Sequence, residues 1–263
     1  MRHVKAIGRL GGLAIGLGIG AAMAATPGTA SADDMQISID GIDLFPTAGN
    51  TATATSGFGD IAIAIGNHSN AIAEGGYGDI AIADGNGTSD LTGSQAIAGD
   101  NTVGATGNNF DLATAIGNQS SAEAAGGSFD SSSANGFATF AFTGGGDSNF
   151  DVASVTGTHS VAEAGDGSND STTVIGDFSS ADSGFGGSFD SVNLLGSNST
   201  ANAENGFGDQ AFIIDFAGRG SLGSDAFAGG AETPGNFDLA GIFGDGLIAH
   251  SIGDYIAHIA PYF

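Results

Sequence analysis

The segment Asp60-Ile-Ala-Ile-Ala-Ile-Gly66 decides the fold, because its pattern returns along the chain at a nearly fixed interval. An aspartate followed six residues later by glycine occurs at Asp60/Gly66, Asp79/Gly85, Asp111/Gly117, Asp130/Gly136, Asp151/Gly157, Asp170/Gly176 and Asp190/Gly196, and Asp209 continues the series with Asp215 in place of the glycine. Most successive aspartates are therefore 19 to 21 residues apart. A period of about twenty residues indicates a repeat architecture in which each unit stacks on the next.

Within each unit, small or apolar residues alternate with variable ones. Counted from the aspartate, position two is Ala62, Ala81, Ala113, Ser132, Ala153, Thr172, Val192 and Ala211, and position four is Ala64, Ala83, Ala115, Ala134, Val155, Val174, Leu194 and Ile213. Position three varies from Ile63 to Asn193, as a water-facing column does. An alternation with period two is typical of a β-strand.

A second half-unit follows each glycine. It usually carries Ser or Thr at position nine and Ala at position eleven, as in Ser69 and Ala71. Each unit therefore holds two short strands, and glycines such as Gly75-Gly76 supply the positive φ angles of the bends. We expect an all-β fold, a parallel β-solenoid or β-roll of 19-to-20-residue coils over residues 51–230. Strands of neighbouring coils lie about 4.8 Å apart, so nine or ten coils would form a rod roughly 45 Å long.

Glycine-rich acidic chains are often disordered, but disorder does not explain columns that repeat over so many units. One coil alone buries too little apolar surface to fold, so the coils must stabilise one another. An interior of alanine lets the two sheets approach closely, and we expect a large residue at position two or four to be poorly tolerated.

The two ends of the repeat domain need covers, because an open solenoid end recruits further strands. Residues 33–50 are expected to form an N-terminal cap or linker, and residues 231–246 a second linker. Residues 247–263 are expected to form an amphipathic capping helix and tail, because Ile248, Ile252, Tyr255, Ile256 and Ile259 share one helical face. An interfacial membrane helix is the alternative, although this segment has no Lys or Arg for anionic lipid.

The first 32 residues have the layout of a secretory signal peptide. Arg2, Lys5 and Arg9 precede a small and apolar stretch, which ends at the cleavage-site sequence Ala30-Ser31-Ala32. The mature chain is then expected outside the cell or on its surface, with no transmembrane segment left after cleavage. It keeps Arg219 as its one basic residue against 29 acidic ones, a formal charge of −28. Nucleic acids and anionic lipids are excluded as partners, because both are bound through Lys and Arg. Cysteine is absent, which excludes disulfides and thiolate metal sites.

Several segments resemble repeats of known families. Asp60–Gly66 and Ser69–Glu74 resemble the head repeats of trimeric autotransporter adhesins, which are β-rolls, although the period here is longer. Gly57–Ala64 is similar to curlin repeats, and Gly75–Asp79 and Gly165–Asp170 are similar to calcium-binding toxin repeats. The signal peptide resembles those of exported actinobacterial, especially mycobacterial, Gly/Ala-rich proteins. These resemblances imply a β-roll that acts in adhesion, in fibre assembly or in calcium binding.

The repeated aspartates are the sharpest candidate site. Stacked coils would place the carboxylates of Asp60, Asp79, Asp111, Asp130, Asp151, Asp170, Asp190 and Asp209 about 5 Å apart along one corner. Such a row either binds cations, with Ca²⁺ as the candidate cofactor, or has raised pKa values. The other interpretation is that each aspartate caps its turn through a hydrogen bond to nearby backbone, and we favour it because the calcium motif is imperfect.

No set of residues points to catalysis, so a non-enzymatic role is expected. Lyases of acidic sugars need Lys or Arg, for which the mature chain offers Arg219 alone; a hydrolase with paired carboxylates stays an alternative. The leading hypothesis is a secreted or cell-surface structural and interaction protein, similar to an adhesin. Its partners would be components of the cell envelope, a host surface or further copies of itself. The alternatives are a calcium-binding β-roll that folds after export and a self-assembling fibre subunit.

Overall fold

The computed structural model describes residues 34–44, 50–87, 92–99, 108–144, 148–165, 167–183, 187–204, 206–214, 224–228, 237–243, 248–251 and 256–259. This part of the chain is all-β and contains no helix, as the repeat predicts. It therefore also holds no helix long and apolar enough to cross a membrane. The expected signal peptide, residues 1–32, lies outside the described residues.

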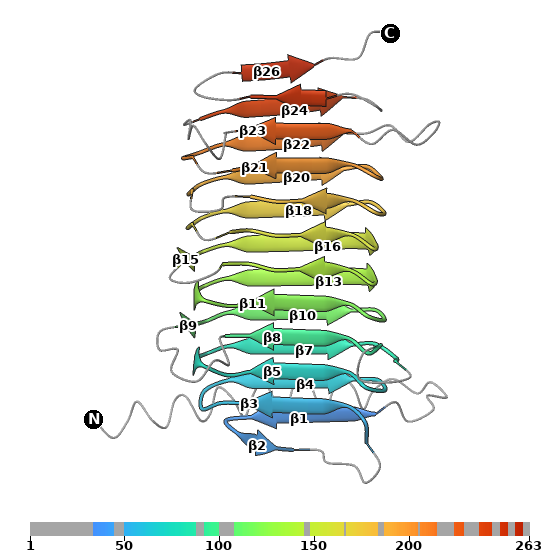
Figure 1. Cartoon of the computed structure of the whole chain (residues 1–263). Helices are drawn as coiled ribbons and strands as arrows, with labels where there is room; N and C mark the ends of the chain where they lie inside the picture. The colour runs from blue at the N-terminus through green and yellow to red at the C-terminus, as the bar shows by residue number, and fades with distance from the viewer. Residues whose placement is uncertain are drawn as a thin grey trace, which may run out of the picture. The chain divides into compact units, whose positions relative to one another are not determined.

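The strands form three sheets that run along the solenoid (Figure 1). The first sheet contains, in spatial order, β2 (Ile42–Asp43), β1 (Met35–Ile39), β4 (Ile61–Ile65), β7 (Ile80–Asp84), β10 (Leu112–Ile116), β13 (Ser131–Phe137), β16 (Val152–Thr158), β18 (Ser171–Ile175), β20 (Ser191–Leu195), β22 (Gln210–Ile214), β24 (Leu239–Phe243) and β26 (Ile256–Ile259). The second contains β3 (Thr53–Ser56), β5 (Asn70–Ala73), β8 (Gln95–Ala98), β11 (Ser121–Ala124), β14 (Phe140–Ala141), β17 (Val161–Ala162), β19 (Ser180–Ala181), β21 (Thr200–Ala203), β23 (Asp225–Ala228) and β25 (Ile248–His250). The third and shortest contains β6 (Gly76–Tyr77), β9 (Asn108–Asn109), β12 (Gly127–Ser128) and β15 (Ser148–Asn149).

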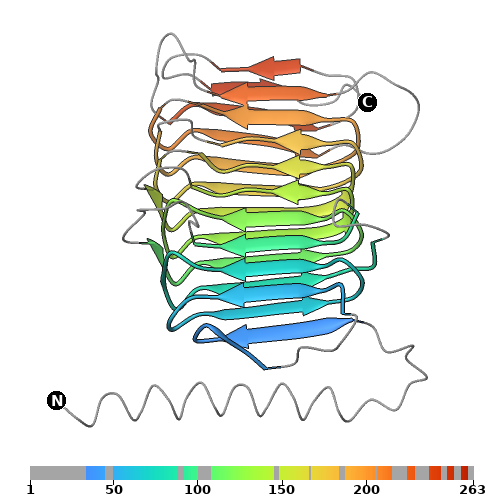
Figure 2. The same ribbon diagram turned by 60° about the horizontal axis from the view of Figure 1, so that its bottom comes forward.

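From β4 to β26 every pairing in the first sheet is parallel, and equivalent residues of successive coils lie side by side. Ala62 pairs with Ala81, and Ala81 pairs with Ala113. The second pairing is kept although the aspartates of those two units, Asp79 and Asp111, are 32 residues apart. The register is therefore kept across this longer unit. Figure 2 shows the resulting stack, in which each coil lies directly on the previous one. The sequence-derived period and register are confirmed.

Alanine fills most of the interior. The side chains at positions two and four of each coil are buried, as are the alanines of the second sheet that face them. Larger residues appear towards the C-terminal coils, where Val155, Val174, Leu194, Ile213 and Ile242 are all buried. Most residues at position three are more accessible, as expected, but Ile63 is buried. These side chains contact the facing strand of the same coil as well as the neighbouring coils, so a single coil buries few of them and stability depends on the stack.

In several coils the corner after the strand of the first sheet is held by glycine and serine. A Cβ atom on Gly136 would lie 1.8 Å from the carbonyl oxygen of Gly157, and Gly136 has a φ of 143°. Only glycine therefore allows the coils to approach to their observed spacing here. The hydroxyl group of Ser160 donates a hydrogen bond of 2.6 Å to the carbonyl oxygen of Gly176 in the next coil. Ser69, Ser120 and Ser179 make the equivalent bond.

The N-terminal end of the first sheet is closed by a strand of opposite direction. Strand β1 pairs antiparallel with β4, and β2 pairs antiparallel with β1. The side chains of Ser38 and Ser56 share a hydrogen bond of 2.9 Å across this end. The parallel arrangement of the coils therefore stops at β1.

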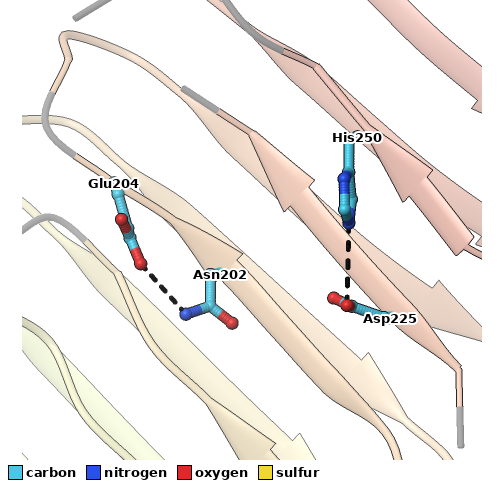
Figure 3. A network of polar contacts seen from close by, with 4 residues as sticks. All are labelled: Asn202, Glu204, Asp225 and His250. Carbon is cyan, nitrogen blue, oxygen red and sulfur yellow. Dashed lines mark hydrogen bonds and ion pairs between the residues drawn. The ribbon is translucent and has the colours of Figure 1, made fainter. Parts of the chain in front are cut away.

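The expected C-terminal helix is wrong, and so is the linker expected over residues 231–246. Strand β24 lies within that linker and continues the first sheet, β26 pairs with it, and β25 adds to the second sheet. A side-chain contact also joins β25 to β23: Nε2 of His250 lies 3.6 Å from Oδ2 of Asp225 (Figure 3). Figure 3 also shows Asn202 Nδ2, which donates a hydrogen bond of 3.2 Å to Glu204 Oε1. Of the five residues on the expected helical face, Ile248 lies in β25, and Ile256 and Ile259 lie in β26. The buried residue of β25 is Ala249, and Ile242 is buried in β24.

Candidate binding surface: an aromatic corner above a buried aspartate column

All eight predicted aspartates lie in one column, together with Asp238, which the sequence analysis missed. Their side chains point into the solenoid and are at most 1 % exposed. The backbone N–H of each aspartate donates to Oδ1 of the aspartate one coil earlier, at 2.8–3.0 Å, in the pairs Asp79–Asp60, Asp111–Asp79, Asp130–Asp111, Asp151–Asp130, Asp170–Asp151, Asp190–Asp170, Asp209–Asp190 and Asp238–Asp209. The column is thus a hydrogen-bond ladder that joins consecutive coils, a capping role that acts between coils rather than within one turn.

The second carboxyl oxygen, Oδ2, is buried without a hydrogen-bond partner in Asp60, Asp79, Asp111, Asp130, Asp170 and Asp190. Glycines leave room for it: a Cβ on Gly187 would lie 2.2 Å from Asp190 Oδ2, and one on Gly167 would lie 2.6 Å from Asp170 Oδ2. An ionised carboxylate in such a place is costly, so the neutral acid is favoured.

The pKa values follow from this burial. Loss of hydration raises the pKa of Asp130 to about 8, the pKa of Asp79 and Asp170 to about 7, and the pKa of Asp111 and Asp190 to about 6. The backbone amide donated by the next aspartate acts in the opposite direction, while the neighbouring carboxyls of Asp111 and Asp151 raise the pKa of Asp130 further. At neutral pH Asp130 is therefore mostly protonated and Asp79 and Asp170 are about half protonated, so the column carries less negative charge than its count of aspartates suggests.

Few oxygen atoms of the aspartate column are open to a calcium ion. Each Oδ1 is already an acceptor for the next coil, and the carboxyl groups have almost no exposed surface. Within the described ranges, no group of three or more His, Cys, Asp or Glu side chains is arranged to hold a metal ion. A calcium ion at these aspartates would have to enter the interior and use the Oδ2 atoms.

The residue just before each aspartate adopts the left-handed conformation. It is Gly59, Gly78 or Gly208 in some coils and Asn169 in one, which are residue types that tolerate a positive φ. In five coils it is phenylalanine, with φ between 61° and 65°, at Phe110, Phe129, Phe150, Phe189 and Phe237. A left-handed conformation costs a residue with a Cβ roughly 1–2 kcal/mol.

These phenylalanines do not gain burial in exchange for that cost. Each of the five rings is 50–69 % exposed. In the coils that have glycine before the aspartate, the aromatic residue stands one position earlier, at Phe58, Tyr77 and Phe207, which are 43–69 % exposed. Backbone strain that supports an exposed apolar side chain points to a role in binding rather than in folding.

The eight rings form one row along the corner, which we term the aromatic ladder: Phe58, Tyr77, Phe110, Phe129, Phe150, Phe189, Phe207 and Phe237. The ring centroids of Phe110 and Phe129 are 5.2 Å apart and those of Phe129 and Phe150 are 5.0 Å apart, with the rings nearly parallel. The row continues across the glycines, since a Cβ on Gly78 would lie 2.7 Å from the ring of Phe110. Asn169 interrupts the ladder once, in the same backbone conformation.

A smaller aromatic stack lies at another corner and provides a comparison. His159 stacks on Phe178 with centroids 5.1 Å apart, and Phe137 meets His159 edge-on. Phe178 is also left-handed, with φ of 55°, and 61 % exposed, while Asn198 holds the same conformation one coil later.

A comparison of the chain with protein-family models, curated proteins and solved structures finds no match. The candidate surface is therefore identified from the geometry of this chain alone. The aspartate column was predicted from the sequence, but the aromatic ladder was not. Its signal is a phenylalanine directly before the aspartate, which recurs at Phe110, Phe129, Phe150, Phe189 and Phe237.

Proposed function

We propose that this chain is a non-catalytic interaction protein of the cell surface or the extracellular space, in which the solenoid is a scaffold and the aromatic ladder is the binding surface. The observation that carries the proposal is the row of exposed aromatic side chains, five of them on strained backbone. Polar residues at the same position, such as Asn169, give the same backbone without the ring. The backbone conformation therefore does not require the rings, which supports a role for them in contact with a partner.

The size of the apolar surface supports an interaction role. Eight aromatic side chains that are each roughly half exposed leave on the order of 900 Å² of apolar surface in one row, taking about 200 Å² for a whole side chain. The largest apolar patch of an ordinary monomer covers about 300–600 Å². Asn169 divides this surface into a run of five rings with about 560 Å² and a run of three rings with about 330 Å². The longer run is at the upper end of that range.

The scaffold suits such a role. Because the aspartate ladder and the Ser–Gly bonds join each coil to the next, the rings are held at fixed spacing before any partner binds. A rigid surface loses little conformational entropy on binding.

The proposal is tested with Phe129→Asn and Phe150→Asn together, in the chain without residues 1–32. Asparagine is the native residue of the same column at Asn169, so the backbone should be retained. The control is Phe178→Asn, which removes an exposed left-handed phenylalanine from the other corner. Binding to cell-envelope fractions, to host matrix components and to the chain itself would be measured by surface plasmon resonance.

The double variant should lose at least tenfold in affinity for whichever partner the wild type binds, and the control should not. Equal binding by wild type, double variant and control would reject the ladder as the binding surface.

A further inference from the structure

We propose that the partner of the aromatic ladder is a second copy of this solenoid, packed side by side, ladder against ladder. This inference rests on the proposed function, because it names the partner of the same surface. The N-terminal end of the first sheet is a less suitable contact between copies, since β1 reverses the strand direction there. We place the contact along the length of the coils, where the rings are exposed.

The exposed shape of the ladder favours a partner with the same repeat. Phe110, Phe129 and Phe150 stack with interplanar angles of 16° and 3°, so their ring faces cover one another and their edges point outward. Over these three coils the surface is therefore a series of ribs and grooves at the coil spacing of about 4.8 Å. A second ladder has ribs at the same spacing, so the two surfaces match in period.

The same stacking makes other partners less suitable. A saccharide or a cation binds to the face of an aromatic ring, and between Phe110, Phe129 and Phe150 the faces are taken by neighbouring rings. The pairs Phe58–Tyr77, Phe189–Phe207 and Phe207–Phe237 are edge-on or tilted, so this argument applies to the central three rings. Two ladders related by a twofold axis would make a self-complementary contact.

The available area matches that of a stable dimer. A standard interface buries about 800 Å² on each partner, and the ladder alone exposes on the order of 900 Å². Leu112 and Val152, which are 39 % and 41 % exposed, follow two residues after Phe110 and Phe150 and extend the apolar surface.

The charge beside the ladder is low for so acidic a chain. The residues that precede the rings in the central coils are polar but uncharged, namely Ser128, Asn149 and Ser188, and the aspartates that follow the rings are buried. Glu123, Glu163 and Asp182 belong instead to the second sheet or follow its strands. Asp40 and Glu74 are acidic neighbours at the N-terminal end: Asp40 Oδ1 accepts the N–H of Gly59, and the charges of both residues raise the pKa of Asp60. The remaining repulsion between two copies is screened at physiological salt, where the Debye length is about 8 Å.

Sedimentation equilibrium of residues 33–263, from about 1 to about 200 µM at physiological salt, tests the proposal. The wild type should be dimeric in this range. The triple variant Phe110→Asn, Phe129→Asn and Phe150→Asn should raise the dimer dissociation constant at least 100-fold, and Phe178→Asn should leave it unchanged. Far-UV circular dichroism confirms the fold of each variant, and the single variant Phe129→Asn, with an expected rise of at least fivefold, replaces the triple variant if that fails to fold.

A second readout locates the contact. The chain has no cysteine, so a single one can be introduced at Ser128 beside the ladder or at Thr200 on the exposed face of the second sheet. Spin labels at Ser128→Cys should show a short distance between copies, and labels at Thr200→Cys should show a longer one. The reverse order of distances would overturn the ladder contact.

A wild type that is monomeric at every concentration overturns this inference, as does a triple variant that dimerises like the wild type. The two proposals remain distinguishable. If the wild type is monomeric but the ladder variants lose binding to an envelope or matrix component, the second copy is the wrong partner and the proposed function stands. If the ladder substitutions change neither measurement, both proposals fail.

Discussion

Replacing one buried aspartate by asparagine should make the solenoid less sensitive to alkaline pH. The pKa of Asp170 is raised from 3.8 to about 7, chiefly by burial, so the folded chain holds a proton that the unfolded chain releases. For such an acid the stabilisation is complete below the unfolded pKa and is lost as the pH rises to the folded pKa. Between about pH 5.5 and pH 7 the loss at this one site is about 2 kcal/mol, from 1.36 kcal/mol per pH unit. Above pH 7 the contribution is constant.

Asp170→Asn removes this proton release and keeps an oxygen that can accept the N–H of Asp190. The free energy of unfolding of wild type and variant would be measured in urea by far-UV circular dichroism at about pH 5.5 and about pH 8.5, both above the pI of about 4.1. Relative to the wild type, the variant should gain about 2 kcal/mol from the lower to the higher pH. Asp177→Asn, at an exposed position, should show no such gain. A wild type whose stability rises over this interval, or a variant that follows it in parallel, would refute the raised pKa of Asp170.

Three further substitutions or treatments test the corners and the interior. Gly136→Ala should cost at least about 3 kcal/mol of unfolding free energy in urea, because its Cβ would overlap the carbonyl of Gly157; a cost below about 1 kcal/mol would contradict the close coil spacing. Ser160→Ala should cost about 1–3 kcal/mol by the same measurement, since the carbonyl of Gly176 loses its buried donor, whereas Ser180→Ala should be near neutral. Chelation with EDTA should leave the far-UV circular dichroism of the mature chain unchanged, because Oδ1 of the column already accepts backbone amides; a loss of β signal would instead support the calcium-binding β-roll.

The repeat made the architecture predictable, because strand pairing between coils preserves equivalent positions. Position two is buried in every described coil, whether it holds alanine, Ser132 or Val192. The C-terminal coils were mistaken for a linker and a helix because their apolar residues also fit a helical spacing. The pattern that would have corrected this was present, since Asp238 is followed six residues later by Gly244.

The direction of the aspartate side chains could not be read from spacing alone. A corner residue can point inward or outward, and the choice here depends on the left-handed residue before it, such as Phe129 before Asp130. Phenylalanine is a poor predictor of that conformation, because glycine and asparagine are its usual residues. The aromatic ladder was missed for a related reason. An aromatic residue beside a turn is normally expected to pack inside, whereas these rings are exposed.

Amide hydrogen exchange of the mature chain, resolved by residue, tests the stacked coils most directly. The N–H groups of Asp79, Asp130 and Asp170 donate to the preceding coil and should be protected to nearly the same degree as those of the central strands. Exchange of these amides at the rate of an unstructured chain, while the strands remain protected, would contradict the aspartate ladder. Unstructured exchange along the whole chain would contradict the solenoid itself.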